Sequence, residues 1–100
     1  MDVVVLFVAG CPNRHLACER LGSALSAIGR ADLAIQERMV ADGQEATGLG
    51  MAGSPTILVN GRDPFAREGG PSLSCRLYRD GDGRPDGAPS VEELIRVLRP

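Results

Sequence analysis

The residues from Val3 to Ala9 form an apolar run that does not alternate with polar residues and is rich in β-branched side chains. Such a run predicts a strand buried on both faces, because a strand with one face in water alternates between apolar and polar residues. A helical pattern follows from Pro12 to Ile28, where apolar residues recur every three or four positions, at Cys18, Leu21, Leu25 and Ile28. A buried strand that leads directly into an amphipathic helix predicts an α/β fold.

The remaining sequence predicts three further strands and two further helices. We expect strands over 32–40, 55–60 and 74–79, a short helix over 44–49, and a final helix that begins with the capping box Ser90-Val91-Glu92-Glu93. Because 100 residues can bury one modest core, we expect a single domain over residues 1–100.

The composition argues against several classes of protein. The formal net charge is −2, so we expect no basic face for nucleic acid. No apolar stretch approaches the ~20 residues of a membrane span. Asp2 follows Met1, which does not fit the basic start of a signal peptide. We therefore expect a cytoplasmic protein without membrane or nucleic-acid partners, whose three cysteines are reduced thiols, catalytic groups or ligands.

Cys11 lies at the junction between the buried strand and the first helix. If Pro12 is the first helical residue, Cys11 is the N-cap, and its sulfur faces the unpaired N–H groups of the helix. Those groups, the helix dipole and the nearby Arg14 cation would all favour the thiolate. The alternative is an inert buried thiol, since free cysteines are often buried.

A second phrase, Gly53-Ser54-Pro55-Thr56, opens another apolar run. Together with the Cys-Pro turn, the order of the elements and the capped final helix, it resembles the thioredoxin-like superfamily in its shorter, glutaredoxin-like form. The resemblance implies a four-stranded mixed sheet of order 2-1-3-4 flanked by helices, with Cys11 as nucleophile. It also implies a cis Pro55 that lies against the thiol and a Ser54 backbone that pairs with bound peptide or small thiol. We assign Pro12 and Thr56, which flank these residues, to the same substrate groove.

The sequence departs from the superfamily's two-cysteine motif, because Arg14 stands where the second cysteine would be. The resemblance therefore implies monothiol exchange, in which an external low-molecular-weight thiol releases Cys11 and no bound cofactor is needed. A small thiol or a protein disulfide would be the partner, and we expect a monomer.

The other two cysteines do not reach Cys11 in the fold that we expect. Cys18 lies seven residues along the same helix, a rise of ~10.5 Å, and is expected to be a small core residue. If the last two strands form an antiparallel hairpin, Cys75 lies about 13 Å from the Pro55 end of the neighbouring strand. We leave open whether Cys75 packs in the core or is a second functional sulfur.

Two other classes of function remain open. Cys11, His15 and Cys18 have helical spacing, but without a Cys-x-x-Cys pair we assign no metal site. The segments Asp63–Phe65 and Ser74–Tyr78 are similar to small bacterial thioredoxin-like proteins often labelled alkylmercury-lyase-like. They suggest a protein that handles organomercury or arsenic through Cys11 with Cys75 or Cys18.

The other class that remains open is a non-catalytic thioredoxin-fold binding module. We expect the Asp63 carboxylate to be solvated, and Arg76 and Arg79 to form the polar face of an edge strand.

Overall fold

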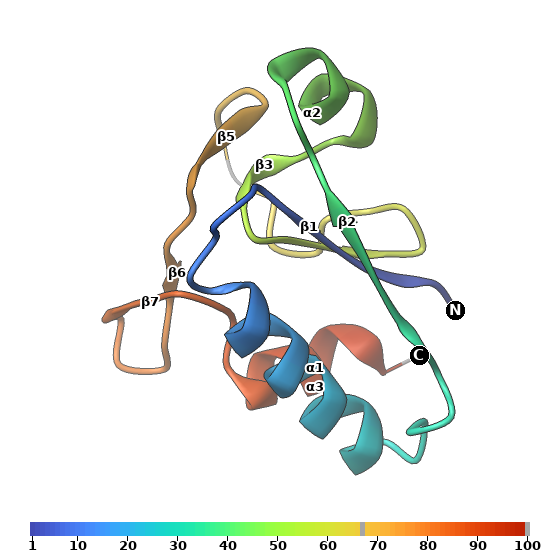
Figure 1. Ribbon diagram of the computed structural model, residues 1–100. Helices are drawn as coiled ribbons and strands as arrows, with labels where there is room; N and C mark the ends of the chain where they lie inside the picture. The colour runs from blue at the N-terminus through green and yellow to red at the C-terminus, as the bar shows by residue number, and fades with distance from the viewer. Residues whose placement is uncertain (67, 100) are drawn as a thin grey trace.

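A three-stranded mixed sheet forms the middle layer of the computed structural model, which describes residues 1–66 and 68–99. Strand β1 (Val3–Phe7) is central, as the apolar run predicts. It pairs in parallel with β2 (Ile35–Met39) and antiparallel with β4 (Thr56–Val59) (Figure 1). The α/β class is therefore confirmed.

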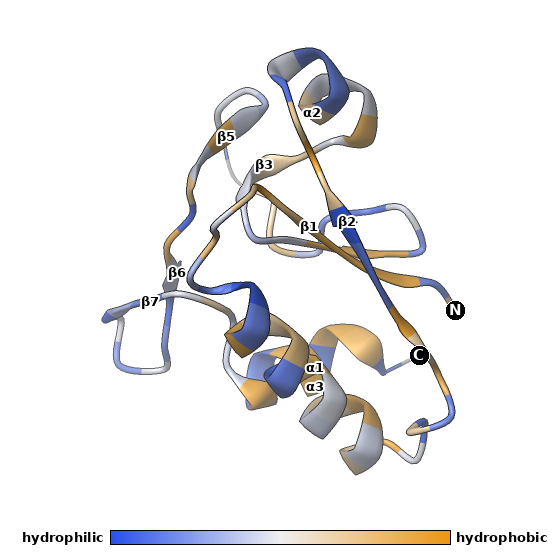
Figure 2. Cartoon of the chain, viewed as in Figure 1, coloured by the Kyte–Doolittle hydropathy of each residue, from blue (hydrophilic) through white to orange (hydrophobic). Residues whose placement is uncertain are grey.

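Helices cover both faces of this sheet. Helices α1 (Arg14–Ala27) and α3 (Val91–Leu98) lie side by side on one face, and α2 (Gly43–Leu49) lies on the other (Figure 1). The side chains of β1 alternate between two cores, and Figure 2 shows the apolar colour along this strand. The first core joins Val3 and Val5 to Leu21, Leu25, Ile57 and Leu94, and the second joins Leu6 to Val40, Ala46, Met51 and Leu58. Each fully buried Leu or Ile contributes roughly 1.5–3 kcal/mol through removal of apolar surface from water.

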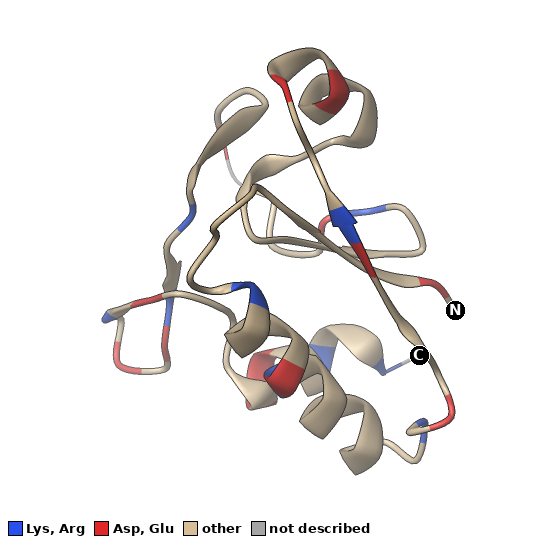
Figure 3. Cartoon of the chain, in the orientation of Figure 1, with Lys and Arg blue, Asp and Glu red and all other residues tan. Residues whose placement is uncertain are grey.

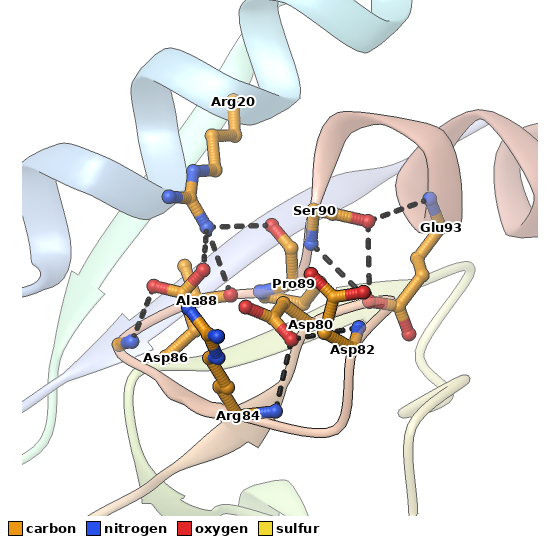
Figure 4. Close-up of polar contacts among 10 residues, drawn as sticks. Arg20, Asp80, Asp82, Arg84, Asp86, Ala88, Pro89, Ser90 and Glu93 are labelled. Atoms are coloured by element: carbon orange, nitrogen blue, oxygen red, sulfur yellow. Dashed lines mark hydrogen bonds and ion pairs between the residues drawn. The ribbon is translucent and has the colours of Figure 1, made fainter.

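The ends of two helices follow their local signals. In α2, the Asp42 side chain accepts a hydrogen bond from the Glu45 N–H, and Gly50 ends the helix with a left-handed φ of 77°. In α3, the predicted capping box is formed, since the Ser90 hydroxyl accepts from the Glu93 N–H and the Glu93 carboxylate accepts from the Ser90 N–H (Figure 4). The capping box of α3 was predictable because its two residues lie only three positions apart.

Arg20 joins α1 to the segment that precedes α3. Its guanidinium donates to the Asp86 carboxylate at 2.8 Å and to the carbonyl oxygens of Ala88 and Pro89 at 3.0 and 3.3 Å (Figure 4). The hydrogen bond from Arg20 lowers the pKa of Asp86 below its ordinary value. This contact holds the start of α3 against α1.

The predicted four-stranded sheet of order 2-1-3-4 is wrong in its fourth strand, since the central sheet has three strands in the order β2-β1-β4, of which β4 lies in the segment predicted as a strand over 55–60. The segment 74–79 is not a single strand beside β4. Instead, β5 (Ser72–Cys75) pairs in parallel with β3 (Ala52–Ser54), and β6 (Tyr78–Arg79) pairs antiparallel with β7 (Pro85–Asp86). The break falls at Arg76, whose side chain is buried rather than exposed on the polar face of an edge strand.

Charged residues of both signs are interspersed along the chain (Figure 3). Within residues 1–66 and 68–99, no helix has the length and apolar character needed to cross a bilayer.

The capping box of α3 yields a stability prediction. Replacing Ser90 with Ala removes the acceptor for the Glu93 N–H, so the free energy of unfolding should fall by about 1 kcal/mol in urea titrations. Ser23→Ala, at an exposed position inside α1, is the matched control and should cause no loss, because Ala is the better helix former. Equal losses in the two variants would contradict the capping role.

Candidate functional site

Cys11 lies in the turn that joins β1 to α1, where it is half-buried. Its N–H donates to the Val8 carbonyl oxygen at 3.1 Å, and Gly10 adopts the positive φ of 75° that such a turn requires. The expectation that Cys11 is the N-cap is wrong, because Asn13 is the N-cap and α1 begins at Arg14. The chain completes the turn before it becomes helical, so the free N–H groups of the helix begin two residues later than expected.

Arg14 directs its guanidinium toward the sheet. It forms an exposed ion pair with Glu37 of β2 at 3.5 Å, and its guanidinium carbon lies 4.7 Å from the centre of the Phe7 ring. An action of Arg14 on the Cys11 thiolate stays a prediction.

Ser54 connects the second phrase to the turn that carries Cys11. The Ser54 hydroxyl oxygen accepts a hydrogen bond from the Val8 N–H at 3.0 Å, while Val8 in turn accepts the bond from Cys11. The structure thus brings together two segments that are more than forty residues apart in the sequence. The peptide bond between Ser54 and Pro55 is cis.

The predicted groove residues differ in exposure. Pro12 is exposed, whereas Ser54, Pro55 and Thr56 are buried. The Pro55 carbonyl oxygen accepts from the Tyr78 hydroxyl at 2.7 Å, and the Thr56 hydroxyl donates to the Gly53 carbonyl oxygen at 2.6 Å. The second phrase is therefore held firmly from inside the protein.

Cys75 lies beside Ser54, which the sequence did not predict. The two residues are paired positions of the parallel strands β3 and β5, and the Arg76 N–H donates to the Ser54 carbonyl oxygen at 3.0 Å. The expected antiparallel register, which separated Cys75 from this end of the strand, is therefore wrong. Gly53 allows the close approach, because a Cβ at this position would lie 2.8 Å from the Cβ of Arg76. The glycine directly before Ser54 was the sequence feature that could have indicated this close approach of the two strands.

Cys18 packs in α1 against the first core, as expected for a small core residue. Burial is the main cause that raises the pKa of its thiol to about 11. The negative charge of Glu37 and a hydrogen bond to it act in the same direction, and the positive charge of Arg14 opposes them. Cys18 is therefore held as a neutral thiol near neutral pH.

A buried ion pair stands behind the second phrase and was not anticipated. Arg76 and Asp63 approach to 2.6 Å, with side chains only 3% and 8% exposed. The Arg76 guanidinium also donates to the Phe65 carbonyl oxygen at 2.6 Å and to the Thr56 hydroxyl at 3.4 Å, and it lies over the Tyr78 ring. We call these five residues the Arg76 cluster. The expectations of a solvated Asp63 and a solvent-facing Arg76 are both wrong.

The helical spacing considered for a metal site is not formed, because Cys11 precedes the helix that carries His15 and Cys18. In the part of the chain that the structure describes, no group of three or more His, Cys, Asp or Glu side chains could hold a metal ion. Asp63, the acid within the segment that is similar to the alkylmercury-lyase-like proteins, is paired with Arg76.

No protein-family model, curated protein or solved structure matches the chain. Any inference about its function therefore rests on its own residues and their geometry.

The Arg76 cluster yields a second stability prediction. Arg76→Leu leaves the buried Asp63 carboxylate without its cationic partner, so the free energy of unfolding should fall by roughly 3–5 kcal/mol. Arg30→Ala breaks an exposed ion pair with Asp32 and should cost less than about 1 kcal/mol. Denaturant titration of both variants measures the difference. A loss for Arg76→Leu as small as that for Arg30→Ala would show that the buried pair does not support the fold.

The raised pKa of Cys18 yields a prediction about labelling. With a pKa of about 11 instead of 9.0, the fraction of thiolate at pH 8 is about 100-fold lower than in an unperturbed thiol. Iodoacetamide should therefore modify Cys18 far more slowly in the folded protein than in the urea-unfolded chain, as followed by peptide mass spectrometry. Equal rates in the two states would contradict the pKa shift.

Proposed function

We propose that this protein is a thioredoxin-like thiol–disulfide oxidoreductase of monothiol type, with Cys11 as the nucleophile. The observation that carries the proposal is the hydrogen bond between the Val8 N–H and the Ser54 hydroxyl, which joins the Ser54-Pro55 phrase to the turn of Cys11. The strand order β2-β1-β4, with a helix directly after β1, supports the thioredoxin-like assignment. The fourth strand of the resemblance is the part that departs from it.

In the proposed reaction, the Cys11 thiolate attacks one sulfur of a disulfide R–S–S–R′. A bond forms between Cys11 and the R-bearing sulfur, and R′S⁻ leaves with the electron pair of the broken bond. A low-molecular-weight thiol then attacks the mixed disulfide and releases Cys11. The substrate is a small-molecule or protein disulfide, and the chemistry requires no bound cofactor.

The geometry around Cys11 suits such a reaction. The thiol is half-buried in a turn rather than packed within a helix, and Pro12 beside it is exposed. We give Arg14 an electrostatic part through its charge at the start of α1, shared with its ion-pair partner Glu37. We also propose that the protein acts as a monomer in the cytoplasm.

One observation favours a second candidate. The placement of Cys75 opposite Ser54 brings a second thiol toward the Cys11 turn, and soft metals such as mercury prefer thiolate ligands. A mercury- or arsenic-handling protein is therefore the alternative. The pairing of Asp63 with Arg76 weighs against a lyase, since it occupies the acid that would deliver a proton.

The proposal predicts which cysteine the activity requires. Cys11→Ser should reduce the rate at which a mixed disulfide between a peptide and a low-molecular-weight thiol is cleaved by at least roughly 100-fold. Cys18→Ser, the matched control, should retain the wild-type rate because Cys18 is packed in α1 as a neutral thiol. A Cys11→Ser variant that kept full activity would refute the proposal.

Alkylation supplies an independent readout of the same prediction. At pH 6, Cys11 should be alkylated faster than free cysteine, because the proposed exchange requires a reactive nucleophile. A non-catalytic binding module would instead leave Cys11 no more reactive than the free amino acid.

A further inference from the structure

Cys75 reaches the neighbourhood of Cys11 through two successive contacts. Cys75 is paired with Ser54 in the β3–β5 ladder, and the Ser54 hydroxyl accepts the Val8 N–H at 3.0 Å. Val8 is the residue whose carbonyl oxygen accepts the Cys11 N–H at 3.1 Å. In Figure 1, the turn that follows β1 and the strand β5 lie on the same side of the molecule.

The side chain of Cys75 lies on the appropriate face of its strand. Side chains two residues apart on a strand lie on the same face. The Ser54 side chain points to the end of β1, as its bond to Val8 shows. Arg76, which follows Cys75, points into the Arg76 cluster. Leu73 of β5 lines a hollow together with Val8 and Ala9, and Cys75, two residues farther along the strand, lies on the same face as Leu73.

The two remaining cysteines differ in their readiness to react. Cys75 is exposed, and a cavity of about 420 Å³ opens beside it between β3, β5 and the preceding loop. Cys18 packs against the core, and burial raises its pKa to about 11. An attack on Cys11 is therefore far easier for Cys75 than for Cys18.

We propose that Cys75 is the resolving thiol of Cys11, supplied from β5 in place of the cysteine absent at position 14. The inference rests on the proposed function, with Cys11 as the nucleophile, and replaces its release step, in which an external thiol attacks the first mixed disulfide. After Cys11 has formed the mixed disulfide Cys11–S–S–R, the Cys75 thiolate attacks the Cys11 sulfur and RS⁻ leaves, while the Cys75 proton passes to solvent. The pair Cys11–Cys75 is oxidised by two electrons, and the substrate disulfide is reduced to two thiols. Two low-molecular-weight thiols then reduce the pair and become a disulfide themselves.

The geometry sets one requirement for this step. A disulfide needs the two Cα atoms within about 7 Å. Residues 8–13, which carry Cys11, belong to neither strand nor helix, so the proposed step requires no change in the central sheet. Both partners come from segments that the Ser54 contacts already hold together.

The proposal is tested with one equivalent of a chromophoric aromatic disulfide and the Cys18→Ser variant, which keeps Cys11 and Cys75. This variant should release two aromatic thiolates for each probe molecule consumed and should retain no aromatic group. Peptide mapping should then show a disulfide that joins Cys11 to Cys75. Cys75→Ser in this background should release one thiolate, a twofold lower yield, and keep the aromatic adduct on Cys11.

A positional control separates a specific resolver from a nearby exposed thiol. Leu77 is 54% exposed and lies two residues beyond Cys75, past the buried Arg76. In the Cys18→Ser/Cys75→Ser background, Leu77→Cys should not restore the second thiolate, because position 77 is not paired with Ser54.

The outcomes distinguish this inference from the proposed function. A persistent adduct on Cys11 while Cys75 is present, covalent dimers through Cys75, or full restoration by Leu77→Cys would each overturn the resolving role. Those results would leave a monothiol enzyme intact as long as Cys11→Ser abolishes mixed-disulfide cleavage. Retention of cleavage by Cys11→Ser would instead refute the proposed function itself.

Discussion

The ion pair between Arg76 and Asp63 is the contact on which the arrangement of the site depends. Two charges withdrawn from water are costly unless hydrogen bonds satisfy their remaining polar atoms. Here the guanidinium also reaches the Phe65 carbonyl and the Thr56 hydroxyl, while the Arg76 N–H binds the Ser54 carbonyl. One residue thereby ties the loop before β5, the start of β4 and the end of β3 together. Strand β5 ends at Cys75, directly before Arg76, and the next strand, β6, begins at Tyr78.

This arrangement determines which residues lie at the candidate site. Ser54 has its hydroxyl on the end of β1 and its carbonyl on β5, so it lies between the turn of Cys11 and the strand of Cys75. The buried residues of the second phrase are supported from behind by Tyr78 and Arg76. The residues proposed to react or to bind substrate lie outside these buried residues, since Cys11 is half-buried and Pro12 and Cys75 are exposed.

Much of the fold followed from local patterns, and the errors arose where distant residues decide. The central strand, the left-handed end of α2 at Gly50 and the capping box at Ser90 all depend on neighbours along the chain. The register of β5 depends instead on Gly53 and Arg76, which are distant in sequence, and a backbone approach that only glycine permits has no periodicity to detect. The start of α1 was misplaced because a turn closed by Val8 and Cys11 precedes it, and Pro12 alone does not distinguish a turn from a first helical residue.

The sequence by itself determined the α/β class, the position of Cys11 between strand and helix, and the absence of a cysteine at position 14. Those features follow from residue type, spacing and the short-range preferences of the backbone. Only the tertiary structure decided that Cys75 stands opposite Ser54 and that Asp63 is paired rather than solvated. Both depend on whether a charged side chain is turned into the protein or into water. That choice is made by the partners that the folded chain provides, because an arginine is stable in the interior only where a carboxylate and carbonyl groups meet it.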